Sequence, residues 1–232
     1  MSKLFESTEI NGMRLANRFV RSATWEGLAA DDGAVTPRLT QTMVALADGG
    51  VGLIISGHAY VSPEGQAGPW QLGLYKDELV EGLVSMCDAV HQAGGKIVAQ
   101  LAHAGHFAAK DLAGQAPHVV SDFEGLANSP RHELTQDDIH RLVQAYAAAA
   151  GRAKAAGFDG VQMHSAHGYL LSQFLSPAFN RREDDYGGAI ENRARVHLEI
   201  LNAIRGAVGK QYPVLIKINS EDCIENGLTV DD

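Results

Sequence analysis

The sequence predicts an α/β protein with a parallel sheet, of the TIM (β/α)8-type barrel class. Short apolar runs alternate five times with amphipathic segments of helical period along the 232 residues, which is the pattern of strands joined by crossover helices. Glycines end most of the helical segments. An open nucleotide-binding sheet would show a GxGxxG turn after its first strand, but residues 22–33 read SATWEGLAADDG. The barrel is therefore favoured over the open sheet.

The N-terminal residues predict a hairpin followed by the first strand of the barrel. Residues 7–18, STEINGMRLANR, place Asn11 and Gly12 between two short alternating runs, which is typical of a β-hairpin with a tight turn. The first barrel strand is expected over residues 19–24.

Capping signals mark where two of the later helices begin. Thr36 and Pro37 supply an N-cap and a proline at the first helical position. Thr135 and Asp138 have the spacing of a capping box. With the apolar periodicity, these signals predict helices over about 36–50, 77–93, 135–157 and 190–208. They also predict strands over 51–57, 158–164 and 212–219, and a strand with its exit loop over 96–105.

The number of predicted units is smaller than a closed barrel needs. Eight βα units close a barrel, and this chain supplies the hairpin and about the first five. We therefore expect one domain over residues 1–232 that is truncated at its C-terminus. Two segments, residues 106–134 and 172–188, show little regular pattern, and long loops of this kind tend to be functional.

Composition excludes several classes of partner. The formal net charge of -9 does not provide the basic face that a nucleic-acid binder needs. No run approaches the length of a membrane span, and the N-terminus lacks the apolar core of a signal peptide. Cys87 and Cys223 form no CxxC pair. We expect a cytoplasmic protein with a small-molecule substrate, and a homo-oligomer remains open.

Polar side chains follow the predicted strands at the end where barrel active sites lie. They come from all five strands, so they converge on one rim if the fold is right. In chain order, the candidates are Ser22, Ala23, Thr24 and Trp25, then Ser56, Gly57 and His58, then Gln100 and His103, then His164, His167 and Tyr169, and last Lys217 and Asn219.

The pair His164 and His167 admits three interpretations. On a regular strand these two positions face opposite sides, but Gly168 allows the chain to turn so that both rings point inward. The rings could grip an oxygen as neutral donors, ligate a metal, or include one histidine satisfied in the core. HxxH is not HExxH, and no obvious carboxylate joins it. With Tyr169 beside them, a donor cluster is favoured, and no metal site is expected.

Two further polar residues lie in apolar strands. Gln100 is expected to be buried, so its amide needs partners, either the neighbouring backbone or the edge of a heteroaromatic ring. Lys217 stands among Leu215, Ile216 and Ile218, where it needs an anion, sheds its proton, or reaches water at the strand end.

Four segments together resemble the Old Yellow Enzyme family of FMN-dependent ene-reductases, also called NADH:flavin oxidoreductases. They are NRFVRSAT at 17–24, VGLIISG at 51–57, QLAHAG at 100–105 and HSAHGYLLSQFLSPAFNRREDDYGGAIENRAR at 164–195. The last is long and specific, and the likeness runs along essentially the whole chain. Near Trp25 this chain lacks the cysteine that tunes the flavin in some members.

The resemblance implies an FMN-binding barrel that takes its electrons from NADH or NADPH. It places the flavin across the strand ends, with the cofactor contacts at Ala23, Thr24, Gly57, His58, Gln100 and Lys217. His164 and His167 would hold the carbonyl oxygen of an activated alkene near Trp25, and Tyr169 would be the candidate proton donor.

The implied reaction passes hydride from NAD(P)H through the flavin to the β-carbon of an α,β-unsaturated carbonyl compound. Two alternatives stay open. The chain could be a non-catalytic truncated barrel that lacks flavin, or, less favoured, a metal-dependent barrel lyase.

Overall fold

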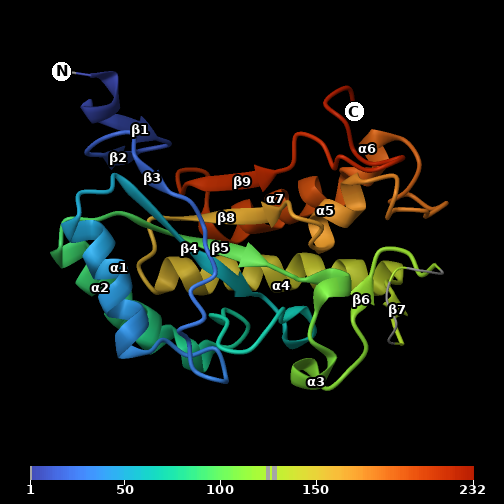
Figure 1. Cartoon of the computed structure of the whole chain (residues 1–232), viewed down its shortest axis with the longest axis horizontal. Coiled ribbons are helices and arrows are strands. Elements are labelled where there is room, and N and C mark those ends of the chain that lie inside the picture. Colours follow the sequence, from blue (N-terminus) through green and yellow to red (C-terminus); the bar gives the residue numbers. More distant parts are fainter. Residues whose placement is uncertain (1, 124–125, 127–129) are drawn as a thin grey trace.

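The computed structural model of the chain describes residues 2–123, 126 and 130–232. Its centre is a curved parallel sheet of five strands in the order β3-β4-β5-β8-β9 (Figure 1). The strands are β1 (Thr8–Ile10), β2 (Met13–Leu15), β3 (Val20–Arg21), β4 (Leu53–Tyr60), β5 (Ile97–Ala102), β6 (His118–Val119), β7 (His132–Glu133), β8 (Gly160–Ser165) and β9 (Val214–Ile218). The helices are α1 (Pro37–Asp48), α2 (Val80–Gln92), α3 (Lys110–Ala113), α4 (Gln136–Ala155), α5 (Leu170–Leu175), α6 (Ile190–Arg193) and α7 (Arg195–Val208).

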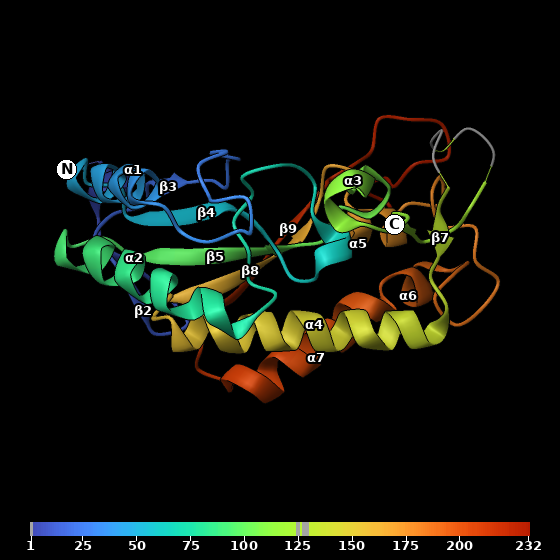
Figure 2. The same ribbon diagram turned by 90° about the horizontal axis from the view of Figure 1, so that it is seen from below.

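The long helices connect the parallel strands and bury the convex face of the sheet (Figure 2). Alternate residues of β5, such as Ile97, Ala99 and Leu101, share one apolar cluster with side chains of α1, α2, α4 and α7. Helix α4 begins at the capping box of Thr135 and Asp138, as predicted. The large core therefore lies between the sheet and the helices and leaves the concave face to other side chains.

The N-terminal hairpin lies at the opposite end of the sheet from the α3, α5 and α6 segments (Figure 1). Strands β1 and β2 pair antiparallel around the Asn11–Gly12 turn, as the sequence predicts. The segments around α3, α5 and α6, with the short parallel pair of β6 and β7, gather where the barrel strands end (Figure 1). The C-terminal ends of the barrel strands thus lie next to these loop segments.

Several predicted boundaries differ from the structure. The first strand pairs with β4 only through Val20 and Arg21, and beyond them the Glu26 side chain makes the contact with β4. Strand β4 continues past Gly57 and His58 to Tyr60, with an irregular register between Ile55 and His58. The last predicted helix is interrupted at Ala194 into α6 and α7. No helix among the described residues is both long and apolar enough to cross a bilayer.

Candidate active site

The concave face of the sheet changes from apolar to polar along the strands. At the N-terminal end the hairpin covers a small apolar cluster whose buried members are Met13, Leu15, Leu53, Ile55 and Val98. Further along, Gln100 of β5 is in register with Gln162 of β8. Two residues on, His164 of β8 is in register with Lys217 of β9. The polar side chains thus occupy the C-terminal end of the face, where barrel enzymes carry their active sites.

A pair of buried amides forms the middle of this face. Gln100 Nε2 donates a hydrogen bond to Gln162 Oε1 at 2.8 Å, and the two residues are 2% and 7% exposed. The Gln100 backbone N–H donates to Ser56 Oγ at 3.2 Å. Gln100 is therefore fixed by a side chain rather than by the neighbouring backbone alone.

Three histidines and a tyrosine form a ring cluster above the amides. The ring centroids of His164 and His167 lie 5.1 Å apart, and those of His164 and Tyr169 lie 4.9 Å apart. His58 joins from β4, with its centroid 5.4 Å from that of Tyr169. The Tyr169 hydroxyl oxygen lies 3.2 Å from His58 Nε2. The structure therefore brings together four of the predicted site residues.

A sharp corner after β8 explains how His164 and His167 reach each other. His167 and Gly168 both adopt the left-handed backbone region, with φ of 62° and 74°, which reverses the alternation of a strand. The His167 N–H donates to Asn219 Oδ1 at 3.1 Å. Gln173 Nε2 donates to the Gly168 carbonyl at 2.7 Å. The neighbouring strand end and α5 therefore hold the corner in place.

The imidazoles of the cluster are neutral at pH 7. Burial, reinforced by the charge that His167 would carry, lowers the pKa of His164 to about 3. The same causes lower the pKa of His58 to about 4. Burial raises the pKa of Tyr169, which keeps its phenol protonated. Among the described residues His164 Nδ1 has no hydrogen-bond partner and is buried, which is costly unless a ligand satisfies it.

The segment after β3 lies at the edge of the site. Ala23 packs against the apolar cluster under the hairpin. Thr24 and Trp25 are exposed, and Trp25 keeps 52% of its surface accessible. Lys217 Nζ donates to Ser22 Oγ at 3.4 Å, so the predicted cation borders this segment.

A partly buried ion pair that sequence reasoning missed holds the segment against β4. Arg21 and Glu26 form a salt bridge at 2.8 Å, and Glu26 Oε1 accepts the Gly57 N–H at 3.1 Å. A Cβ at Gly57 would overlap Glu26 Oε2 and lie 2.9 Å from the Thr24 carbonyl oxygen. Gly57 therefore contacts the segment of Thr24 and Glu26 through a close backbone approach that only glycine permits.

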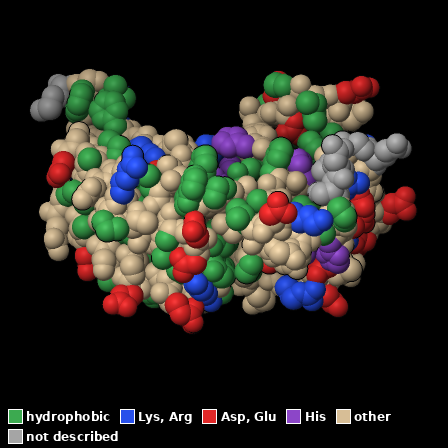
Figure 3. Space-filling model, turned by 60° about the horizontal axis from the view of Figure 1, so that its bottom comes forward, with side chains coloured by type: hydrophobic (Ala, Val, Ile, Leu, Met, Phe, Trp, Pro, Cys, Tyr) green, Lys and Arg blue, Asp and Glu red, His purple; other side chains and the backbone are tan. Residues whose placement is uncertain are grey.

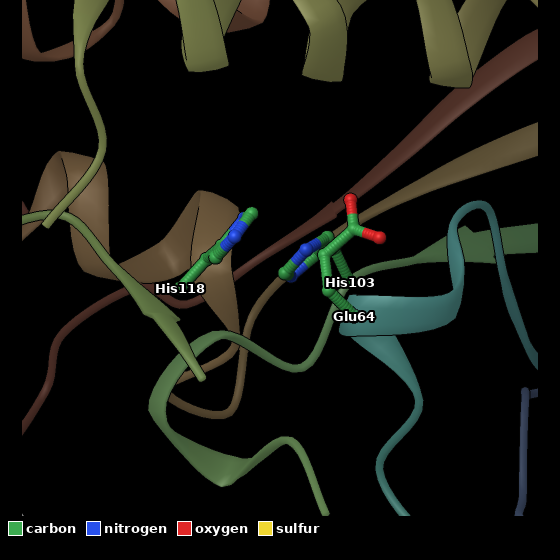
Figure 4. A group of neighbouring side chains, drawn as sticks. All are labelled: Glu64, His103 and His118. Atoms are coloured by element: carbon green, nitrogen blue, oxygen red, sulfur yellow. The ribbon is translucent and has the colours of Figure 1, made fainter. Parts of the chain in front are cut away.

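A second histidine group lies beneath the loops, away from the ring cluster. Glu64, His103 and His118 have potential ligand atoms within 4.8 Å of one another (Figure 4). However, His103 Nδ1 accepts the Gly105 N–H at 3.1 Å, so the neutral ring carries its proton on Nε2. A metal-bound histidine instead needs a lone pair at the ligand nitrogen and a proton on the other nitrogen. With its Nδ1 lone pair used by the Gly105 N–H and its proton on Nε2, His103 is not set up to bind a metal ion.

The concave face fits a planar heteroaromatic group with carbonyl and N–H edges. It offers buried amides, an ammonium group at Lys217 and the unsatisfied Nδ1 of His164. Figure 3 shows histidine side chains at the hollow between the N-terminal end and the loops. These groups suit a flavin ring that lies across the strand ends.

Comparisons with known proteins agree with this description. Residues 3–232 match the model of the NADH:flavin oxidoreductase / NADH oxidase family. An NADH oxidase of Thermoanaerobacter brockii is 40% identical over 99% of this chain, which spans 36% of that relative. An NADPH dehydrogenase of Bacillus licheniformis is 36% identical over 99% of this chain, which spans 67% of that protein.

Solved structures show the same arrangement of strands and helices. Old Yellow Enzyme from Pichia sp. AKU4542 superposes with a TM-score of 0.90 at 29% identity, over 99% of this chain and 62% of its own. A complex of 2-naphthoyl-CoA reductase with 2-naphthoyl-CoA superposes with a TM-score of 0.94 at 30% identity, over 99% of this chain and 37% of its own. This chain thus spans between about a third and two thirds of these relatives.

Proposed function

The chain belongs to the NADH:flavin oxidoreductase / NADH oxidase family, and we propose that it carries the side chains that polarise the substrate carbonyl in an FMN-dependent ene-reductase. The fold prediction is confirmed, since the curved sheet with its hairpin is part of a TIM barrel shared with Old Yellow Enzymes. The family uses FMN, with NADH or NADPH as reductant. The proposed reaction is reduction of the alkene of an α,β-unsaturated carbonyl compound.

We propose that the cofactor contacts are those that the resemblance implied. Gln100, itself held by Gln162, would meet the pyrimidine edge of the ring. Lys217 would place a positive charge beside the ring oxygens and nitrogen that become negative on reduction. Ala23, Thr24, Gly57 and His58 would border the ring from the first two strands. When bound, FMN would supply the hydride-transfer chemistry, from the nicotinamide to the alkene.

The proposal rests on one observation, the contact of the His164 and His167 rings beside Tyr169. Two neutral imidazoles can each donate one N–H to a carbonyl oxygen. They stabilise the enolate-like charge that develops on this oxygen when the β-carbon gains hydride. His164 Nδ1, which is buried and has no partner in the part of the chain that the structure describes, suits such an oxygen. Tyr169 would then protonate the α-carbon.

The substrate enters beside exposed aromatic side chains. Trp25 and Phe107 keep 52% of their surface accessible, and the Phe107 ring lies 6.1 Å from that of Tyr169. These side chains would contact the apolar part of an enone. The 2-naphthoyl-CoA complex of a similar protein supports an extended thioester as a further class of conjugated carbonyl substrate.

The absorption spectrum of the purified protein tests the proposal. We expect a yellow protein, or one that FMN reconstitutes, and oxidation of NADH or NADPH that depends on added 2-cyclohexenone. The doubly substituted variant His164→Ala/His167→Ala should keep the flavin spectrum and lose enone-dependent turnover. A protein that remains colourless in excess FMN would exclude the proposal and favour the flavin-free alternative.

A further inference from the structure

His58 has a contact that the predicted role in cofactor binding does not use. It stands on β4 after the irregular register that follows Ile55, and its ring turns toward the cluster of β8. Its centroid lies 6.3 Å from that of His164 and 5.4 Å from that of Tyr169. His58 Nε2 and the Tyr169 hydroxyl oxygen are 3.2 Å apart, which is hydrogen-bond distance.

We infer that His58 is a positioning residue that donates its Nε2–H to the Tyr169 oxygen and so directs the tyrosine proton toward the substrate. The inference rests on the proposed function, in which Tyr169 is the proton donor. One hydrogen atom lies between the two groups. If Tyr169 supplied it, the proton needed by the substrate would point at His58 instead.

The surroundings favour a contact between neutral partners. Burial keeps the His58 imidazole neutral, with one N–H, and the Tyr169 phenol protonated near pH 7. The titratable groups beside the pair are His164 and His167, and Lys217 of β9 acts on these two histidines. No acidic side chain of the described residues is among the groups that act on His58 or Tyr169. Both partners are therefore neutral, and His58 donates to the tyrosine oxygen when its proton is on Nε2.

The hydrogen bond would act when the proton moves. The O–H bond of Tyr169 breaks while a C–H bond forms at the α-carbon of the substrate, and the electron pair stays on the tyrosine oxygen. The His58 Nε2–H then donates to a phenolate, and hydrogen bonds to charged oxygens are the stronger class. A proton from water restores the O–H bond after the product leaves.

The tautomer of His58 gives a direct test on the unaltered protein. We would label the FMN-loaded protein with ¹⁵N-histidine and assign His58 by comparison with His58→Gln. We expect a protonated Nε2 and an unprotonated Nδ1. An unprotonated Nε2 would overturn the inference, because the nitrogen would then accept the tyrosine proton.

The pKa of Tyr169 gives a second test whose sign separates the two arrangements. With ¹³C-tyrosine, and with Tyr169→Phe to assign the signal, His58→Leu should raise the Tyr169 pKa by about one unit or more. His58→Gln, which retains an N–H donor, should stay closer to the unaltered protein. A fall in His58→Leu would show that His58 accepts the proton and would overturn the inference. His140→Gln, on the exposed face of α4, is the matched control.

Turnover separates this inference from the proposed function. His58→Leu should lower kcat about tenfold with little change in KM, since the hydrogen bond strengthens only as charge develops. A protein without enone turnover but with the expected tautomer and pKa change would contradict the proposed function alone. Normal turnover with an unprotonated Nε2 would contradict the inference alone.

Discussion

At the scale of single residues, the site depends on histidines that stay neutral. Their neutrality comes from burial, which disfavours the charged ring, and from their closeness to one another. A neutral imidazole can donate one proton and accept another, whereas an imidazolium can only donate. The cluster therefore supplies hydrogen-bond donors near pH 7 without a change of charge.

The donor role proposed for His164 predicts a large and specific loss. If His164 holds the substrate oxygen as proposed, His164→Ala should lower kcat/KM for an enone about 10²- to 10³-fold. His140→Ala, exposed on α4, should change it little. Steady-state kinetics with matched flavin content provide the measurement. An equal loss in both variants would argue against a specific role.

Buried histidines also predict how stability depends on pH. The pKa values of His103 and His164 fall to about 3, and those of His58 and His197 to about 4, mainly through burial. Histidines of the unfolded chain titrate near 6.5, so between these values the unfolded state binds more protons. Stability should therefore be full above pH 6.5 and fall as the pH drops toward 4, by up to about 1.4 kcal/mol per unit for each histidine.

Urea unfolding at pH 5.0 and 7.5 would measure this effect. Hydrogen bonds from Thr135 and His132 hold the pKa of Asp138 well below its usual range, against the opposing effect of its burial, so this group adds its own loss of stability only below about pH 4. The histidines therefore account for most of the expected change in the free energy of unfolding between pH 5.0 and 7.5. His103→Gln should reduce the slope, and a free energy of unfolding that is equal at the two pH values would refute the explanation.

Sequence reasoning predicted His164, His167 and Tyr169, whose rings the structure brings together, but it missed Gln162 and Glu26. Gln162 could have been found, because it lies two positions before His164 and so shares its face of the strand. Glu26 gives no such signal. Its role depends on the approach of two loop and strand segments, which no periodic pattern describes.

At the scale of elements, the first strand is held more by side chains than by its own ladder. Its pairing with β4 spans two residues, and the contact of Glu26 with the Gly57 N–H continues the connection beyond it. The predicted strand over residues 19–24 was too long for this reason, since apolar composition does not show where a backbone turns away. The helices were predicted more closely, because their caps and apolar stripes are local signals.

A pair of glycine substitutions tests this connection. In Gly57→Ala the new methyl group would overlap the Glu26 carboxylate, so we expect a loss of stability of about 1–3 kcal/mol and weaker FMN binding. In Gly151→Ala, within α4 and with no atom near the new methyl group, stability should rise by about 0.5–1 kcal/mol. Thermal unfolding and flavin titration give both quantities. A neutral Gly57→Ala would show that the segment moves freely.

At the scale of the whole molecule, the sheet keeps apolar side chains exposed at both edges. On β9, Ile216 and Ile218 are 48% and 54% exposed. At the β3 edge, Phe19 and Val20 are 39% and 47% exposed. Edge strands of this kind are templates for pairing with further chain. The sequence indicated five units of a larger barrel, but it did not indicate which side chains the sheet edges would leave exposed.

In a protein of residues 1–232 alone, the exposed edge predicts association between chains. Ile216→Lys places a charge on the convex side of β9, away from the ring cluster, and should shift the protein toward the monomer, since edge lysines oppose strand pairing. Sedimentation velocity over a range of concentrations would measure the change. Leu198→Lys, at an exposed apolar residue of α7, is the control. Equal behaviour of the two variants would place the association elsewhere.

The left-handed corner at His167 and Gly168 limits how this protein can diversify. Asparagine adopts such a backbone readily, whereas valine, isoleucine and threonine do so at a high steric cost. A change of substrate range that needs a new side chain at position 167 therefore has few mutational routes. Substitutions cost less at positions 25 and 107, where the side chains are about half exposed to solvent. The proposed hydrogen bonds of His164 and His167 to the substrate carbonyl should therefore be kept while the shape of the accepted substrate changes.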